Sequence, residues 1–386
     1  MIQNSLTFEE FIDKKPLYYK EIDHKRVHQA YAILKPHLSR PQVIHVVGTN
    51  GKGSTGRIMA TLLNDRYRVG HFSSPHILRF NERIWIDGED ISDNALEEAH
   101  QQLYTILGAE ISQTLSYFEY TTLLSFVATQ YVDILVLEAG LGGEFDATNV
   151  IEKELSVITP IGLDHQAFLG ESIEEIARTK LNSIDKKALV GLQLYDEVYN
   201  VAKDMASKKR TELYILDKEV DKTLLAITED LNWAYYLYEN AKLALKALDI
   251  LNLSYTLESL YKVELFGRFY KIAPNITIDV GHNLLATEAL VKALDKRVVL
   301  IYNSLDDKDY TAILRLFKPL VEWVEIIDIQ SDRAIKDYKL VAVLEKLDIQ
   351  YKKFDTISTD KNYLVFGSFY TVEAFLNSIK YNIKNQ

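Results

Sequence analysis

The sequence predicts an α/β protein with two domains, each built on a mostly parallel sheet. Short runs rich in β-branched residues alternate along the chain with longer stretches at helical spacing, which is typical of parallel α/β folds. The runs fall into two separate series. The 386 residues are enough for two or three domains of ordinary size, and 47% of them are hydrophobic, which is ample for their cores.

The expected strands lie in two series that flank one strong helix. The first series comprises Val43–Val47, Ile134–Leu137, Ser156–Thr159 and Ala188–Gly191. The second series comprises Thr277–Asp279, Val298–Tyr302, Val324–Ile329 and Tyr363–Phe366. The helix is predicted from the one-sided spacing of Trp233, Leu237, Ala241, Ala244, Leu245 and Leu248. We place the domain boundary after this helix, near Leu257–Leu265, and assign residues 1–260 to the first domain and 261–386 to the second.

Charge and composition exclude several classes of function. Asp and Glu number 55 against 44 Lys and Arg, a net charge of -11, so the chain lacks the basic surface that a DNA or RNA polymer requires. The absence of cysteine excludes disulfides, thiolate nucleophiles and cysteine metal sites. Residues 1–30 contain no apolar stretch like a signal peptide core, and no segment is apolar enough to span a bilayer. We therefore expect a cytoplasmic protein with neither a nucleic-acid polymer nor a membrane as partner.

The strongest functional signal is the glycine-rich turn at residues 48–54, with the sequence GTNGKGS. It follows an expected apolar strand and precedes a helical pattern. Such a turn lets backbone N–H groups and a helix N-terminus converge on phosphate oxygens, and Lys52 adds a positive charge. An ordinary strand-to-helix turn needs neither four small residues nor a lysine, so we interpret the turn as a P-loop. Gly53 separates Lys52 from the Ser54 hydroxyl, a spacing that disfavours a simple Walker-type ATPase.

Two further polar side chains follow strand ends. Glu138 comes directly after the run Ile134–Leu137, and His165 follows the next expected strand within a short loop. Parallel sheets place their ligands at the carboxyl ends of strands, and a carboxylate there suits Mg²⁺. A lone histidine is more often a satisfied polar residue than a ligand. Because Lys52, Glu138 and His165 all lie just beyond strand ends, however, the pattern predicts one metal-nucleotide site.

Lys180 is expected to lie on the apolar face of a helix. The capping box Ser172–Glu175 begins this helix, and Ile173, Ile176 and Ala177 share a face with Lys180. A buried, unpaired ammonium costs several kcal/mol. The lysine must therefore snorkel to solvent, pair with an acid, or be chemically changed, and snorkelling is the commonest of these outcomes.

The chain resembles the folylpolyglutamate synthase and dihydrofolate synthase family, which belongs to the Mur ligase superfamily. The resemblance covers nearly the whole chain, with its motifs in the same order. The earlier motifs are GTNGKGS at 48–54, SSPHI at 73–77, ERI at 82–84, Phe118-Glu119, EAGLGGEFDATN at 138–149 and Leu163–His165. The later motifs are Glu239–Ala241, FGRF at 266–269, DVGHN at 279–283, DKD at 307–309 and VFGS at 365–368. The SPH and ERI segments distinguish this family from the cell-wall ligases, which share the P-loop.

The resemblance implies an N-terminal P-loop ATPase domain, a smaller Rossmann-like C-terminal domain, and an active site in the cleft between them. It assigns the phosphate loop to Asn50, Gly51, Lys52, Gly53 and Ser54, the adenine contact to Asn240, and the C-terminal phosphate and ribose contacts to Arg268 and Asp279. It assigns Mg²⁺ ligands to Ser74, Glu138 and His165, and pterin-side contacts to Phe118, Glu119 and Asp146. Lys180 matches the family lysine that is carbamylated to bind a second Mg²⁺, although Thr179, Leu181 and Asn182 depart from the usual neighbours.

The implied reaction is ATP-dependent amide-bond formation by an acid–amino-acid ligase. The γ-phosphate passes to the substrate carboxylate, the amine of L-glutamate attacks the resulting acyl phosphate, and ADP and phosphate are released. Lys52, Lys180 and His282 are the implied catalytic residues, with two Mg²⁺ ions as cofactors. The acceptor is dihydropteroate, a reduced folate, or both, and we favour both activities in a monomer. The alternatives are a folylpolyglutamate synthase only, or a non-catalytic P-loop nucleotide-binding protein.

Overall fold

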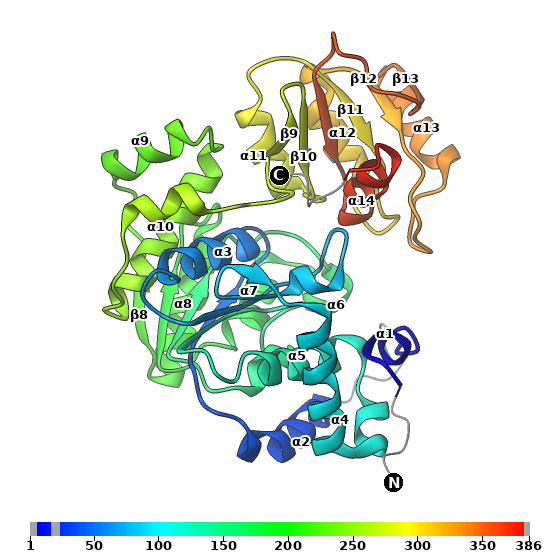
Figure 1. Ribbon diagram of the computed structural model, residues 1–386. Helices are drawn as coiled ribbons and strands as arrows, with labels where there is room; N and C mark the ends of the chain where they lie inside the picture. The colour runs from blue at the N-terminus through cyan, green and yellow to red at the C-terminus, as the bar shows by residue number, and fades with distance from the viewer. Residues whose placement is uncertain (1–5, 17–23, 382–386) are drawn as a thin grey trace. The chain divides into compact units, whose positions relative to one another are not determined.

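The structure is a computed structural model that describes residues 6–16 and 24–381, so part of the segment searched for a signal peptide lies outside it. The chain divides into two compact units. Unit 1 comprises residues 1–221 and 240–263, and unit 2 comprises residues 222–239 and 264–386. Each unit is built on a mostly parallel sheet with helices packed against it, which confirms the predicted fold class (Figure 1).

The described part of unit 1 contains an eight-stranded sheet in the order β4-β3-β2-β5-β1-β6-β7-β8. Pairing is parallel from β2 through β8, and β3 is antiparallel to both β2 and β4. The strands are β1 (Gln42–Val47), β2 (Val69–Phe72), β3 (Ile84–Ile86), β4 (Glu89–Asp90), β5 (Ile134–Glu138), β6 (Leu155–Ile158), β7 (Lys187–Val190) and β8 (Glu212–Ile215). The central strands are buried on both faces, as parallel strands covered by helices must be.

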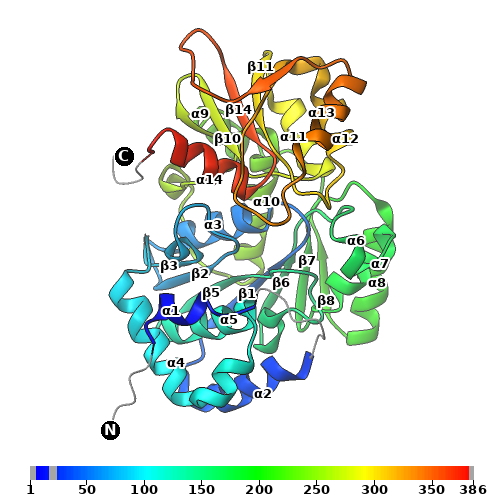
Figure 2. The ribbon, with the colours of Figure 1, turned by 90° about the vertical axis from the view of Figure 1, so that its right-hand side faces the viewer.

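Helices cover both faces of this sheet (Figure 2). One face is covered by α3, which packs on β1, β2 and β5, and the opposite face by a layer that includes α4 and α5. The described helices that lie wholly in unit 1 are α1 (Phe8–Ile12), α2 (His24–Leu34), α3 (Lys52–Leu63), α4 (Asp93–Thr114), α5 (Tyr117–Ala128), α6 (Gln166–Leu169), α7 (Ile173–Leu181) and α8 (Asp196–Lys209). Its 3₁₀ turns are η1 (Lys35–His37), η2 (Phe80–Arg83), η3 (Ala147–Val150) and η4 (Leu257–Lys262).

Unit 2 has its own six-stranded sheet among the described residues, in the order β13-β12-β11-β14-β10-β9. Only the edge strand β9 is antiparallel to its neighbour. The strands are β9 (Tyr270–Ala273), β10 (Ile276–Asp279), β11 (Val298–Tyr302), β12 (Val321–Ile326), β13 (Tyr351–Lys353) and β14 (Tyr363–Phe366). The other elements are α9 (Lys222–Asp230), α11 (Leu284–Ala293), α12 (Tyr310–Phe317), η5 (Lys318–Leu320), α13 (Asp337–Lys346) and α14 (Phe369–Ser378).

Two predicted elements were wrong by more than one residue at an end. The expected strand Val324–Ile329 is β12, which begins and ends three residues earlier because Val321 enters the sheet directly after the turn η5. The strong central helix is α10 (Tyr235–Ile250), and Trp233 lies before it rather than on its face. A left-handed residue, Asn232 with φ of 55°, separates α9 from α10 and keeps the tryptophan out of the helix.

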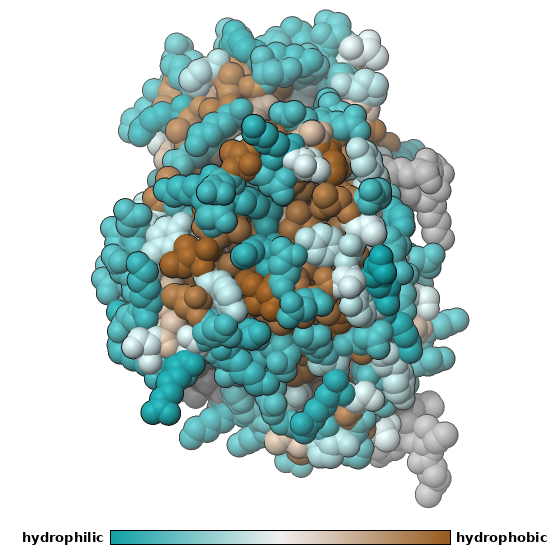
Figure 3. All heavy atoms as spheres, turned by 90° about the vertical axis from the view of Figure 1, so that its left-hand side faces the viewer, coloured by the Kyte–Doolittle hydropathy of each residue, from teal (hydrophilic) through white to brown (hydrophobic). Residues whose placement is uncertain are grey.

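None of the described helices combines the length and apolar character needed to cross a membrane. On the face shown in Figure 3, brown apolar side chains gather in patches between teal polar ones. Much of the surface of a folded protein is normally apolar, so the patches on this face do not by themselves indicate a function.

Lys15 anchors the N-terminal helix region to α4 and α5. Its Nζ donates hydrogen bonds to the backbone carbonyls of Ser112 at 2.6 Å and Leu115 at 2.7 Å. The same ammonium lies 4.6 Å from the ring centre of Phe11 and 5.1 Å from that of Tyr120. Burial lowers the pKa of Lys15 from its ordinary value of 10.5 to about 8. The charged form is thus held less well in the folded chain than in water.

We expect Lys15→Met to flatten the pH dependence of stability between about pH 8 and pH 10.5. In this window the unfolded chain keeps the Lys15 proton while the folded chain releases it, so the free energy of unfolding rises with pH. One proton contributes up to about 1.4 kcal/mol per pH unit. Urea unfolding at a series of pH values would measure the difference, with Lys14→Met at the exposed neighbour as the control. Parallel pH curves for the wild type and Lys15→Met would contradict the prediction.

Candidate functional site

The glycine-rich turn lies between the end of β1 and the start of α3, as predicted. Gly51 is the residue before α3 and has a φ of 83°, a conformation that favours glycine. A Cβ at Gly48 would lie 2.0 Å from Thr159 Oγ1 and 2.9 Å from the Thr159 carbonyl oxygen, so this position has no room for a side chain. Lys52, Gly53 and Ser54 form the first turn of α3, where backbone N–H groups lack intrahelical acceptors. The turn is therefore shaped to receive an anion.

Several buried polar atoms around this turn have no protein partner. Within the described part of the chain, the hydroxyls of Ser54 and Thr55 and the Nδ2 of Asn240 are buried without a hydrogen bond. Asn240 lies beside the turn, because a Cβ at Gly51 would come within 2.7 Å of its Oδ1. A buried donor without an acceptor is costly in a folded protein, and such a group usually bonds to a ligand or a water molecule. The surroundings therefore fit a bound nucleotide.

Lys52 and Glu138 are brought together at the carboxyl edge of the sheet. Lys52 Nζ lies 3.8 Å from Glu138 Oε1 and donates to the Thr49 carbonyl at 3.2 Å. Glu138 ends β5 and is buried, and its Oε2 accepts the backbone N–H of Ser74 at 3.4 Å. The carboxylate of Glu138 and the nearby Ser74 are hard oxygen donors of the kind that Mg²⁺ prefers. These residues could therefore hold a divalent cation next to the glycine-rich turn at residues 48–54.

His165 follows β6, the strand on the other side of β1 from β5. It precedes α6 with a φ of 51°, and its Nε2 lies 3.9 Å from Asp164 Oδ1. The loop before it is tied to the phosphate turn, since the N–H groups of Thr49 and Asn50 both donate to the Pro160 carbonyl. Sequence reasoning missed this role of Thr49, whose hydroxyl also bonds the Gly162 backbone. A threonine inside a glycine-rich motif carries no signal of its own.

Lys180 is buried, and the expectation that it snorkels to solvent was wrong. Its capping box is formed as predicted, with Ser172 and Glu175 bonding each other's backbone. Lys180 Nζ turns inward and donates to the Gly48 carbonyl at 2.9 Å. Burial, followed by the positive charge of Lys52, lowers the pKa of Lys180 to about 7. The interior therefore favours the neutral amine more than water does.

The three residues assigned to the pterin side differ in their surroundings. The Phe118 ring lies against Gly140, where a Cβ would come within 2.3 Å of it. Glu119 has its carboxylate bonded to Arg26 and to the Ser116 N–H at the start of α5. Asp146 is buried and precedes η3, and burial raises the pKa of its carboxyl. Sequence reasoning missed Arg26, because a basic residue in a polar helix is ordinary.

The predicted residues of unit 2 gather around the end of β10. Asp279 is buried and accepts hydrogen bonds from Tyr236 OH at 3.0 Å and from the N–H groups of Phe269 and Gly281. Burial raises the pKa of Asp279. The Arg268 guanidinium lies 5.1 Å from the centre of the Phe369 ring.

His282 lies three residues beyond the end of β10. Its Nδ1 is 3.2 Å from the Val280 carbonyl oxygen. Because a carbonyl can only accept, Nδ1 carries the hydrogen in this contact. In the neutral ring, Nε2 is then the unprotonated nitrogen.

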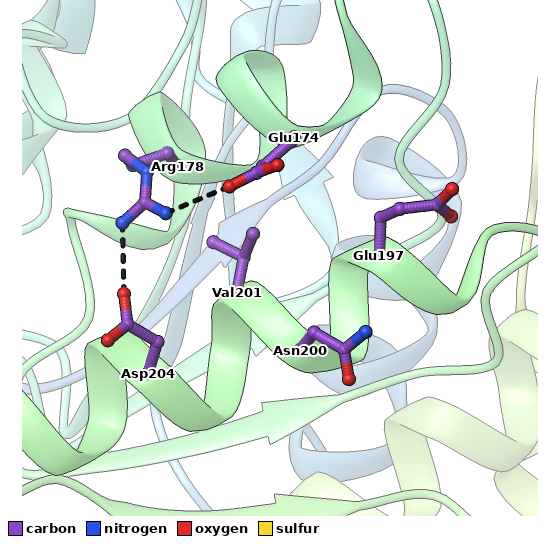
Figure 4. Close-up of a pocket in the computed structure, with 6 residues that line it drawn as sticks. All are labelled: Glu174, Arg178, Glu197, Asn200, Val201 and Asp204. Atoms are coloured by element: carbon purple, nitrogen blue, oxygen red, sulfur yellow. Dashed lines mark hydrogen bonds and ion pairs between the residues drawn. The ribbon is translucent and has the colours of Figure 1, made fainter.

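A surface pocket of about 210 Å³ lies between α7 and α8, and none of the predicted site residues lines it (Figure 4). Figure 4 shows Arg178 reaching toward both Glu174 and Asp204, at 3.1 and 3.0 Å. Arg178 and Lys180 are two positions apart on α7, so they point to different faces of the helix.

No family model matches the chain. It is 31% identical over 395 residues to the dihydrofolate synthase/folylpolyglutamate synthase of Haemophilus influenzae, covering 87% of this chain and 88% of that protein. A solved structure of Escherichia coli FolC in complex with DHPP and ADP is 28% identical with a TM-score of 0.82, covering 98% and 99% of the two chains. A bifunctional folylpolyglutamate synthase/dihydrofolate synthase with Mn, AMPPNP and L-glutamate bound is 26% identical with a TM-score of 0.80, covering 97% of each chain.

Proposed function

Because the chain belongs to the dihydrofolate synthase/folylpolyglutamate synthase family, we propose that it is an ATP-dependent ligase that joins L-glutamate to folate-type acceptors. The relatives with ADP, AMPPNP, Mn and L-glutamate support ATP, a divalent metal and glutamate as its ligands. In this chain the supporting observation is the contact of Lys52 with Glu138 beside the phosphate turn. We assign the reaction to the acid–amino-acid ligases, with ADP and phosphate as products, in a monomeric, cytoplasmic protein.

We propose that residues 1–260 bind ATP and the pterin, and that residues 261–386 complete the glutamate ligase. Asn50, Gly51, Gly53 and Ser54 hold the phosphates with Lys52, and Asn240 contacts the adenine. Ser74, Glu138 and His165 would hold Mg²⁺, which when bound offsets the negative charge of the phosphate oxygens. Phe118, Glu119 and Asp146 form the pterin side. Glu119 holds the backbone at Ser116 in place and Asp146 holds it at Leu141. Arg268, Asp279 and His282 serve the nucleotide and the transferring phosphoryl group from the C-terminal part.

We infer that Lys180 is carbamylated in the working enzyme. The protonated side chain first loses one proton to give the neutral amine, which would then add to CO₂, forming a C–N bond and releasing a second proton, so that a buried anion replaces a buried cation. The lowered pKa of Lys180 supplies the neutral amine that this addition needs. The carbamate oxygens would then be able to hold a second Mg²⁺.

One assay tests the proposed function and separates its alternatives. Phosphate release from ATP is measured with L-glutamate and either dihydropteroate or tetrahydrofolate as acceptor. We expect glutamate-dependent release with both acceptors. Release with tetrahydrofolate alone would indicate a folylpolyglutamate synthase only. ATP binding without glutamate-dependent release would indicate a non-catalytic nucleotide-binding protein.

We expect Arg268→Ala to lose turnover while keeping its fold. Removing one preorganised charge that stabilises a transition state costs about 10²–10³ in rate. The Arg268 guanidinium lies over the ring of Phe369, the first residue of α14, and such a contact is worth only about 1 kcal/mol. Phosphate release and thermal unfolding would be compared with those of Arg333→Ala, which breaks an exposed ion pair with Asp307 in the same unit. An undiminished ligation rate in Arg268→Ala would count against its assigned role.

A further inference from the structure

A buried chain of hydrogen bonds runs from the middle of unit 1's sheet to the glycine-rich loop at residues 140–146. His45, in the central strand β1, places its Nε2 2.8 Å from Thr148 Oγ1. The Thr148 hydroxyl in turn donates to Asp146 Oδ1. His45 and Thr148 have no exposed surface, and Asp146 is 6% exposed. None of these contacts was visible from the sequence, where His45 occupies an apolar strand.

The direction of each hydrogen bond follows from the hydrogens available. A threonine hydroxyl has one hydrogen, and here it points to the Asp146 carboxylate. Its oxygen must therefore accept from His45, so Nε2 of the imidazole carries the hydrogen. Burial lowers the pKa of His45 well below its ordinary value, which keeps the ring neutral with one hydrogen. The His45 Nδ1, buried without a partner, is then the unprotonated nitrogen.

Asp146 uses these contacts to close the glycine-rich loop. Its Oδ2 accepts the Leu141 N–H at 2.7 Å, and its Oδ1 also accepts the Thr148 N–H at 2.9 Å. The loop is therefore held at both ends by one carboxylate. All these partners donate to it, which favours the ionised carboxyl against the cost of burial. Losing the Thr148 hydroxyl would remove one of these donors and leave the His45 N–H without an acceptor.

The closed loop contacts the two sides of the candidate site in unit 1. Gly140 lies against the Phe118 ring, and a Cβ at Gly143 would come within 2.5 Å of the Lys180 carbonyl oxygen. The Glu144 N–H donates to the Thr179 carbonyl at 3.0 Å. A shift of the loop would thus be felt both at Phe118 and at the helix that carries Lys180.

We propose that His45 and Thr148 are positioning residues that act through Asp146 to fix the glycine-rich loop, and so set how the enzyme binds its folate-type acceptor. The part that concerns the acceptor rests on the proposed function. The part that concerns the loop does not, because it follows from contacts within unit 1. The two parts are therefore tested by separate measurements.

The test compares Thr148→Val, which replaces the hydroxyl by a methyl group, with Thr148→Ser, which keeps the hydroxyl. Thr129→Val is the matched control, because Thr129 is equally buried in unit 1 and donates one hydrogen bond, to the Ser125 carbonyl at 2.7 Å. Hydrogen exchange at residues 140–146 is measured in the full chain, without ligands. KM is measured separately for the acceptor and for ATP.

In Thr148→Val we expect amide exchange at Leu141 to become at least about tenfold faster, since a buried hydrogen bond is lost and its partner left unsatisfied. We also expect KM for the acceptor to rise by about tenfold and KM for ATP to change by less than about twofold. Thr148→Ser and Thr129→Val should resemble the wild type in both measurements. If Thr148→Val does not fold, exchange at residues 140–146 is measured in Asp146→Asn instead. Each Asp146 oxygen accepts a different backbone N–H, so the NH₂ group of asparagine would face one of these donors and that hydrogen bond would be lost.

Unchanged exchange at Leu141 in Thr148→Val, or equal acceleration in Thr129→Val, would overturn the positioning role. Equal changes in both KM values would overturn its link to the acceptor. A wild-type enzyme with no folate-dependent activity would instead refute the proposed function. The exchange comparison would still decide whether the loop is fixed in the way we describe.

Discussion

Replacing Lys52 with methionine is expected to lower the turnover of ligation about a thousandfold while the chain keeps its fold. Methionine retains most of the apolar stem but removes the ammonium beside Glu138. A positive charge preorganised for a transferring phosphoryl group is worth about 10²–10³ or more in rate, because it needs no reorganisation during the reaction. Steady-state phosphate release at saturating ATP would measure the effect. Circular dichroism and thermal unfolding would show whether the fold is kept.

The control for this variant is Lys35→Met. Lys35 forms a 3.0 Å ion pair with Glu152 on the surface of the same unit, and exposed pairs of this kind contribute little to stability. Its turnover should match the wild type. A Lys52→Met enzyme that keeps more than about a tenth of wild-type turnover would contradict a role at the phosphoryl group.

Gly367→Ala is expected to have the largest effect on stability, at least about 4 kcal/mol, or to prevent unit 2 from folding. Gly367 follows β14 with a φ of 134°, where side chains are rarely tolerated. An added Cβ would lie 1.9 Å from the carbonyl oxygen of Asn303, beside the neighbouring strand β11. That atom belongs to the backbone, so the clash could be relieved only by moving one strand end away from the other. Urea unfolding would measure the loss.

Gly108→Ala separates the steric clash from the backbone conformation. Gly108 also has a positive φ, 73°, but a Cβ there would meet no atom within 4 Å. Its ψ is 164°, so this variant should lose only about 1–3 kcal/mol, the cost of an extended positive-φ conformation that residues with a side chain rarely adopt. If Gly367→Ala unfolded at the same urea concentration as Gly108→Ala, the clash with Asn303 would not be the cause.

The parts of the fold that the sequence revealed are those with strong local signals. The glycine-rich turn was visible because its residues are contiguous and follow an apolar run. The contact of Lys52 with Glu138 followed from the rule that parallel strands end at one edge. By contrast, β2 was missed, because its four residues include Gly70 and His71 and so lack a clear apolar run.

Contacts between residues distant in sequence could not be predicted in the same way. After Gln42 at its start, β1 consists of valine and isoleucine except for His45, and only the fold brings Thr148 to this histidine. The inward direction of Lys180 depends on the Gly48 carbonyl, which is 132 positions away along the chain. Helical spacing places a side chain on a face of its helix but does not say which acceptor that face will meet.

The way the chain divides between its units limits how it could be shortened. Unit 2 contains residues 222–239 as well as 264–386, so the polypeptide passes from one unit to the other three times. A recombinant fragment that starts at Glu264 would lack Tyr236, which donates to the buried Asp279 and packs on the core of that unit. The C-terminal part expressed alone would therefore have an incomplete core, and the Asp279 carboxylate would lack one of its hydrogen-bond donors. A complementing fragment would have to supply residues 222–239.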